Sequence, residues 1–105
     1  MEEIVSKKVI KIILDIDDSG QQVYVPHDFN VLMVGSQSDT TVSVWGETCQ
    51  TVNNIMLTFS VFGTGHPIPE YYLYVGTAIN PRINAVWHVY AVDEDSLVEV
   101  ETNAA

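Results

Sequence analysis

Hydrophobic and polar residues alternate with a period of two along most of this chain, the pattern of β-strands that bury one face. The segment from Val9 to Ile16 is rich in β-branched residues and predicts a long strand, which the turn at residues 17–20 ends. No segment repeats apolar residues at helical spacing over three turns. We therefore expect strands at residues 9–16, 21–25, 31–37, 41–45, 55–62, 71–75 and 85–92, with a short last strand at 97–100.

The spacing of the turn signals favours an all-β fold. They recur at intervals of roughly 8 to 12 residues, which is typical of a small sandwich or an irregular barrel of about seven antiparallel strands with no long helix. Pro26 suits a strand end, whereas residues 47–54 and 76–84 are expected to be a connector and a loop. The 105 residues predict one domain, 1–105, with its core at about 8–92 and an acidic, flexible tail at 93–105.

The charge balance excludes one class of partner. Fourteen acidic residues face four basic ones, for a formal net charge of −10. Nucleic-acid affinity depends on neutralising phosphates with Lys and Arg, so we expect no binding of DNA or RNA. No apolar run approaches the roughly 20 residues of a spanning helix, and the N-terminus is acidic where a signal peptide is basic. We therefore expect neither membrane insertion nor secretion.

The string GTGHPIP is the most unusual segment of the chain. Gly63 and Gly65 flank Thr64, so the backbone is able to adopt positive φ twice, and Pro67 stiffens the segment after His66. Successive N–H groups in such a turn can form a concave nest for an anion, with Thr64 and His66 adding polar side chains. An ordinary turn between two strands is the alternative interpretation.

Several strings of the chain resemble one family. FSVFGTGHPIP, YLYVGT and AVWHVYAV, together with KIIL at residues 11–14, VLMVGSQ and Trp45, are similar to small tailed-bacteriophage proteins of unknown function. The likeness covers roughly residues 8–92, and GTGHPIP is its most specific part. Those proteins tend to carry a basic connector after the Trp, whereas this chain has the polar GETCQTVNNIM. The resemblance implies a phage product that acts in the host bacterial cytoplasm or in the virion.

Further candidate residues follow the loop. Tyr71 and Tyr72 are suited to stacking on a base or filling a partner's pocket, and equally to covering a sheet. In the strand 85–92 the uniformly apolar set predicts Trp87 in the core, which leaves His88 on the wetter face as a pocket candidate or a surface residue without a role. Arg82 is the one basic residue outside the N-terminal stretch and is a candidate for a phosphate or carboxylate.

No metal or cofactor is expected. The three histidines His27, His66 and His88 lack metal-ligand spacing, and the acidic turn after Asp15 lacks the Gly and Glu of a calcium loop. Cys49 is the single cysteine, so no internal disulfide forms and we expect a small, half-buried residue.

Three functions are compatible with these residues. We expect a non-enzymatic phage-encoded binding protein, an anti-defence protein that sequesters a small phosphorylated or nucleotide-like immune signal. The proposed ligand-binding residues are Gly63, Thr64, Gly65, His66, Pro67, Tyr71, Tyr72, Arg82 and His88. The alternative is a virion structural or assembly protein acting through protein–protein contacts. A hydrolase using His66 and Glu70 is disfavoured because Pro-Ile-Pro holds the two apart. Exposed edge strands favour a homo-oligomer in either case.

Overall fold

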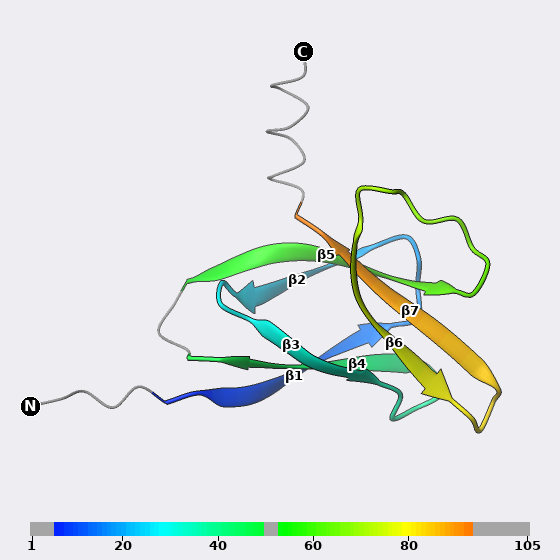
Figure 1. Cartoon of the computed structure of the whole chain (residues 1–105), viewed down its shortest axis with the longest axis horizontal. Coiled ribbons are helices and arrows are strands. Elements are labelled where there is room, and N and C mark those ends of the chain that lie inside the picture. Colours follow the sequence, from blue (N-terminus) through cyan, green and yellow to red (C-terminus); the bar gives the residue numbers. More distant parts are fainter. Residues whose placement is uncertain (1–5, 50–52, 94–105) are drawn as a thin grey trace, which may run out of the picture.

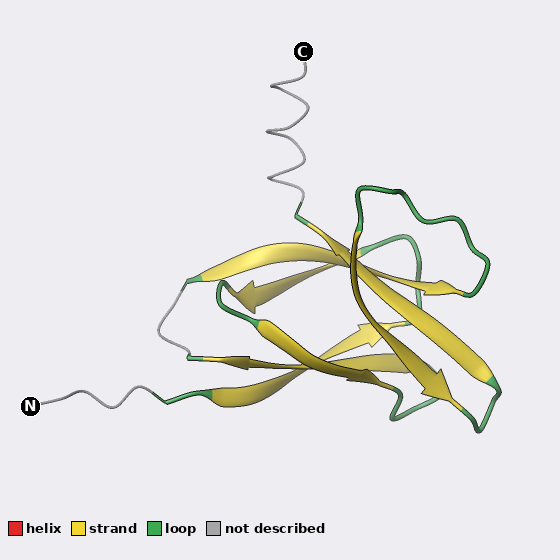
Figure 2. Cartoon of the chain, in the orientation of Figure 1, coloured by secondary structure: helices red, strands yellow, loops and turns green. Residues whose placement is uncertain are grey.

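Two antiparallel sheets pack face to face in the computed structural model, which describes residues 6–49 and 53–93 (Figure 1). Figure 2 shows strands joined by loops. In the described part of the chain no helix is long and apolar enough to cross a membrane. The strands are β1 (Lys8–Asp15), β2 (Gln21–Pro26), β3 (Asn30–Gly35), β4 (Thr41–Thr48), β5 (Asn54–Gly63), β6 (Leu73–Asn80) and β7 (Ala85–Val92).

The sheets have three and four strands. The first has the order β1-β4-β3 and the second the order β2-β5-β7-β6. All pairings are antiparallel, which confirms the predicted all-β class. The space between the sheets is filled by the alternating apolar residues of both inner faces. The buried core residues are Leu14, Val25, Val42, Val44, Phe59, Val61, Ala78, Val89 and Ala91.

One side of the sandwich is closed by contact between the edge strands β3 and β6. Val34 of β3 packs so tightly on Gly76 of β6 that a Cβ at Gly76 would overlap its side chain. The register of β6 against β7 shifts at this point, between Tyr74 and Gly76. A glycine at a bulge allows this close approach, because it carries no side chain to exclude the neighbouring strand.

Most of the predicted strands are confirmed, but several boundaries are wrong: β4 continues to Thr48, and β6 begins at Leu73, which leaves Tyr71 and Tyr72 in the loop before it. The β2 strand ends at Pro26 and β7 spans Ala85–Val92, as the pattern predicts. The predicted loop at residues 76–84 is instead the second half of β6 as far as Asn80, followed by a turn. Gly76 therefore does not begin a loop but lies within β6, where it makes room for Val34. The predicted strand at 97–100 and nearly all of the acidic tail lie outside the described residues.

Candidate functional site

The outer face of the four-stranded sheet gathers several of the predicted site residues. The register places Phe62 of β5 opposite His88 of β7, and Tyr74 of β6 opposite Tyr90 of β7. Because side chains alternate along a strand, these residues share the face turned away from the core. None of the residues in β2, β5, β6 or β7 is charged. The surface is therefore neutral, although the chain carries a net charge of −10.

Five aromatic rings contact one another in series across this face. Their centroids are 5.1 Å apart for Tyr71–Tyr72, 6.2 Å for Tyr72–Phe62, 5.9 Å for Phe62–Tyr90 and 5.4 Å for Tyr90–Tyr74. The rings meet tilted or edge to face, the geometry that aromatic pairs prefer. Phe62 is buried, whereas Tyr71 and Tyr74 remain 52% and 60% exposed. We call these five side chains the aromatic face.

A row of hydroxyl and imidazole groups lies beside the aromatic face. The Thr64 hydroxyl is 2.8 Å from Nε2 of His88, and Nδ1 of His88 is 3.1 Å from the Thr77 hydroxyl. Thr77 is in turn 2.5 Å from the Tyr74 hydroxyl. A neutral imidazole has one donor and one acceptor nitrogen, and a hydroxyl can serve either one. His88 is therefore held at both nitrogens, and Thr64 ties its loop to β7.

The GTGHPIP segment begins a wide loop that leaves the end of β5 and returns to the start of β6 (Figure 1). Gly65 has a φ of 92°, and the His66 amide donates to the Gly63 carbonyl at 3.2 Å. Gly63 itself remains in β5 opposite Trp87 and has no positive φ. The expectation of two positive-φ residues is therefore half right, and one amide of the expected nest is already used within the turn.

His66 lies away from the aromatic face. Its ring packs against Gly63, where an added Cβ would come within 3.4 Å of the imidazole. Here His66 borders a pocket of about 260 Å³ whose other lining residues include Asp17, Asp18 and Trp87. The Asp17 carboxylate accepts hydrogen bonds from the side chain and the backbone of Ser19, which lower its pKa below the usual 3.8. The surroundings of His66 are acidic, which does not favour an anion.

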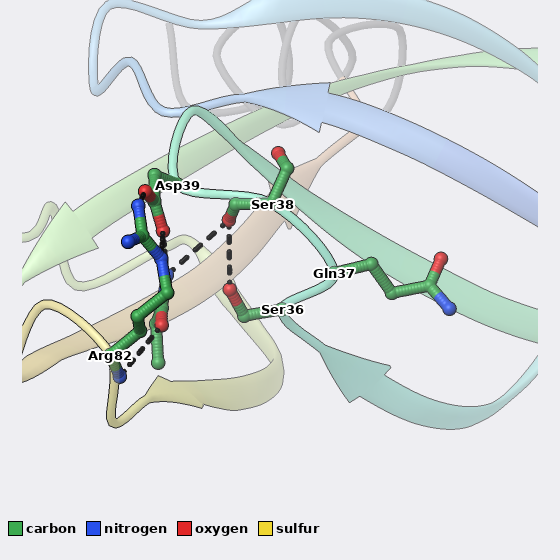
Figure 3. Close-up of a pocket in the computed structure, with 6 residues that line it drawn as sticks. Ser36, Gln37, Ser38, Asp39 and Arg82 are labelled. Carbon is green, nitrogen blue, oxygen red and sulfur yellow. Dashed lines mark hydrogen bonds and ion pairs between the residues drawn. The ribbon is translucent and has the colours of Figure 1, made fainter.

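Arg82 is also separate from the aromatic face. It lies in the β6–β7 turn, where its guanidinium forms an ion pair with Asp39 of the β3–β4 turn (Figure 3). Asn80 donates to the same carboxylate at 3.0 Å, and its own Oδ1 accepts from the Arg82 amide. Figure 3 shows the guanidinium lying against Asp39, at one side of a pocket of about 230 Å³. Arg82 therefore joins two turns of the sandwich, and its charge is already neutralised.

A third polar cluster surrounds Asp28, which the sequence did not single out. Its carboxylate accepts from the Thr48 hydroxyl at 2.5 Å and from the Cys49 amide at 2.9 Å. These two hydrogen bonds, the Thr48 one first, lower the pKa of Asp28 from the usual 3.8. Cys49 is half-buried, which confirms its predicted placement. The cluster fixes the segment before β3 to the end of β4.

The structure thus brings together only part of the predicted set. Thr64, Tyr71, Tyr72 and His88 lie on or beside the aromatic face, whereas His66 and Arg82 lie elsewhere. Trp87 packs against the core, as predicted. Four further residues complete the surface beyond the predicted ligand-binding set, namely Phe62, Tyr74, Thr77 and Tyr90. Alternation along β7 places Tyr90 on the same face as His88, but the bulge between Tyr74 and Gly76 breaks the alternation in β6, so no simple spacing links Tyr74 with Thr77. Among the described residues no group of His, Cys, Asp or Glu is arranged to hold a metal ion.

The fold and this surface define a small antiparallel β-sandwich with an uncharged, tyrosine-rich outer face. The chain belongs to the DUF7352 family, a domain of unknown function whose family model matches residues 5–99. No curated protein and no solved structure matches the chain.

Proposed function

We propose that this chain is a non-enzymatic binding protein that acts through protein–protein contacts made by the aromatic face. One observation carries the proposal: a connected series of five aromatic rings on a sheet without charged residues, in a strongly acidic chain. Cores of protein interfaces are enriched in Tyr and depleted of charge, and tyrosines are frequent energetic hot spots.

The surroundings of the aromatic face support the same reading. Ile79 and Val86, which are paired across β6 and β7 on the outer face, expose 66% and 38% of their surface. Side chains of this size are rarely left in contact with water side by side unless the surface is used. The resemblance to small tailed-bacteriophage proteins supports a role in assembly or in the particle, where such contacts are permanent.

Sequestration of a nucleotide-like ligand is the second candidate. The Thr64–His88 pair is the feature behind it, because a hydroxyl and an imidazole can bind a phosphoryl oxygen while a tyrosine stacks on a base, but such a ligand would have to replace the hydrogen bonds that already hold His88 at both ring nitrogens. Phosphate recognition usually adds Lys or Arg, but no residue of the four-stranded sheet is charged and Arg82 is paired with Asp39. The geometry therefore favours protein contacts over a phosphorylated ligand.

Tyrosine nitration tests the proposal. In the isolated chain Tyr71 and Tyr74 should react with tetranitromethane, because about half of each side chain is exposed. In purified particles of the parent phage both should be protected. Tyr24 is the internal control, because it is 70% exposed on β2 and lies outside the aromatic face. Peptide mass spectrometry would locate each modification.

Two outcomes decide against the main proposal. One is absence of the chain from particles, or equal nitration of Tyr71 and Tyr74 in both states. The other is protection of these tyrosines in the isolated chain by cyclic nucleotides or ADP-ribose derivatives, which would assign the aromatic face to a small ligand instead.

A further inference from the structure

The strand β1 forms an open edge of the three-stranded sheet. It pairs with β4 on one side, and in residues 6–49 and 53–93 no strand pairs with its other side. The opposite edge of this sheet, β3, is covered by its contact with β6. An eight-residue edge strand presents a row of backbone donors and acceptors that another strand is able to join.

The hydrogen bonds of Gln21 reveal which backbone groups point outward. Its side-chain amide donates to the Asp15 carbonyl and accepts from the Asp15 amide, both at 2.9 Å. The backbone groups of Asp15 are therefore turned away from β4. In an antiparallel ladder this orientation repeats at every second residue, so the backbone groups of Lys11 and Ile13 also face the open edge.

The outward side chains of the same residues have a self-complementary order. Lys11, Ile13 and Asp15 lie opposite Trp45, Ser43 and Thr41 of β4, on the outer face of the sheet. Along the strand these three side chains are positive, neutral and negative in turn. Ile13, at the centre, is 59% exposed. If two such strands run antiparallel with Ile13 opposite Ile13, each Lys11 faces Asp15 of the other copy. Opposite charges directly across two strands stabilise the pair.

We propose that β1 pairs antiparallel with β1 of a second copy of this chain, about a two-fold axis at Ile13. The two three-stranded sheets then form one continuous sheet, with Lys11 of each copy next to Asp15 of the other. Such an interface is isologous and closes as a dimer. It is independent of the aromatic face, which lies on the other sheet and stays open.

The arrangement of charges favours a second copy of this chain as the partner of β1. Two chains of net charge −10 repel one another over most of their surfaces. Three of the four cations of the chain are Lys7, Lys8 and Lys11, so the first half of this edge is the most basic stretch of the sequence. In the proposed register every outward charge at the centre of the interface meets its opposite, whereas a slip of four residues between the two strands brings Lys11 opposite Lys11.

The side chain of Gln21 competes with the second copy. It occupies the same Asp15 backbone groups that Lys11 of the partner strand would bind. The dimer therefore requires Gln21 to swing aside, and Gln21→Ala should tighten association.

Charge-swap variants test the proposal by sedimentation velocity on the full chain. The wild-type chain should sediment at about twice its monomer mass of 11.7 kDa. Lys11→Glu and Asp15→Lys should each weaken the dimer by at least about tenfold, because like charges then face each other at two symmetric positions. The double variant should restore it. Lys8→Glu is the matched control: it makes the same charge change on the same strand, but its side chain points to the other face.

Ile13→Pro separates loss of the dimer from loss of the fold. Its N–H faces the open edge, so proline removes no hydrogen bond within the domain and is tolerated in an edge strand. This variant should be monomeric with an unchanged circular dichroism spectrum. A wild-type chain that sediments as a monomer, or a double charge swap that fails to restore the dimer, would overturn the proposal.

Discussion

Asp28 shows how a single side chain stabilises a junction that sequence patterns pass over. It lies in the turn between β2 and β3, where the backbone alone makes the bonds His27 N–H to Asn53 O and Phe29 N–H to Pro26 O. The carboxylate adds bonds from the Thr48 hydroxyl and the Cys49 amide. An ionised acceptor makes stronger hydrogen bonds than a neutral one, so the folded state favours the charged form.

The lowered pKa of Asp28 predicts a pH-dependent contribution to stability. The unfolded carboxyl titrates near 3.8 and the folded one below it, so between the two values the unfolded chain binds more protons. The contribution is complete above about pH 3.8 and is lost as the pH falls through the folded pKa. Asp28→Asn should be less stable than wild type at neutral pH, and the difference should shrink below pH 3.8.

Urea unfolding from pH 7 down to pH 2 measures this effect. Asp18→Asn, which removes an exposed carboxylate on the turn before β2, controls for the change in net charge. A gap between Asp28→Asn and wild type that stays constant over the whole range would refute the role of the carboxylate.

At the scale of elements, the closure between β3 and β6 depends on a glycine. Gly76 lies at the bulge of β6 and leaves space for Val34, which also packs against the core. Gly76→Ala should destabilise the fold by about 1–3 kcal/mol, because the new methyl group overlaps a side chain held in a packed interior. Chemical denaturation gives the free energy of unfolding.

A double-mutant cycle tests whether the overlap with Val34 causes this loss of stability. Val34→Ala removes the overlapping methyl groups, so Gly76→Ala should cost less in the Val34→Ala background. Gly35→Ala is the comparison variant, because its Cβ would meet Met33 Cε and the Trp45 ring at 3.2 Å each, a much milder contact than the overlap at Gly76. Additive effects of the two substitutions at 34 and 76 would contradict this account.

At the scale of the whole molecule, the charged residues and the uncharged sheet occupy different parts of the structure. Neither the four-stranded sheet nor β3 carries a charged residue, so the charges of the described chain lie on β1, on β4 and in the connecting segments. The ion pairs Lys7–Glu47 and Arg82–Asp39 join partly exposed side chains, and such pairs contribute little in water. Self-repulsion of a chain with net charge −10 is then the larger electrostatic effect on stability.

Salt should therefore stabilise this protein. Raising the ionic strength from about 0.01 M to about 0.15 M shortens the screening length from about 30 Å to about 8 Å, which weakens repulsion more than contacts at short range. The melting temperature at neutral pH should rise over this interval. Sodium and potassium chloride should act equally, since screening does not depend on the identity of the ion. A melting temperature that falls with salt would show that the ion pairs dominate.

The tyrosine-rich surface shows which features of the protein the sequence pattern does not predict. Period two placed Trp87 inward and His88 outward correctly, because alternation along one strand is local. The contact of His88 with Thr64 joins residues 24 positions apart, and no local pattern reports it. His66 and Arg82 were grouped with this site by chemistry alone. In the fold both residues lie apart from the aromatic face. The His66 ring packs against Gly63, and Arg82 lies in the turn after β6.

The sequence by itself determined the class of fold and most of the strand positions, because both follow from residue types and alternation along the chain. Only the tertiary structure decided which strands are neighbours, that β1 remains an open edge, and that five aromatic rings meet on one surface. These features depend on pairing between distant segments. The free energy of that pairing comes from packing two inner faces together, and one-dimensional spacing does not encode the result.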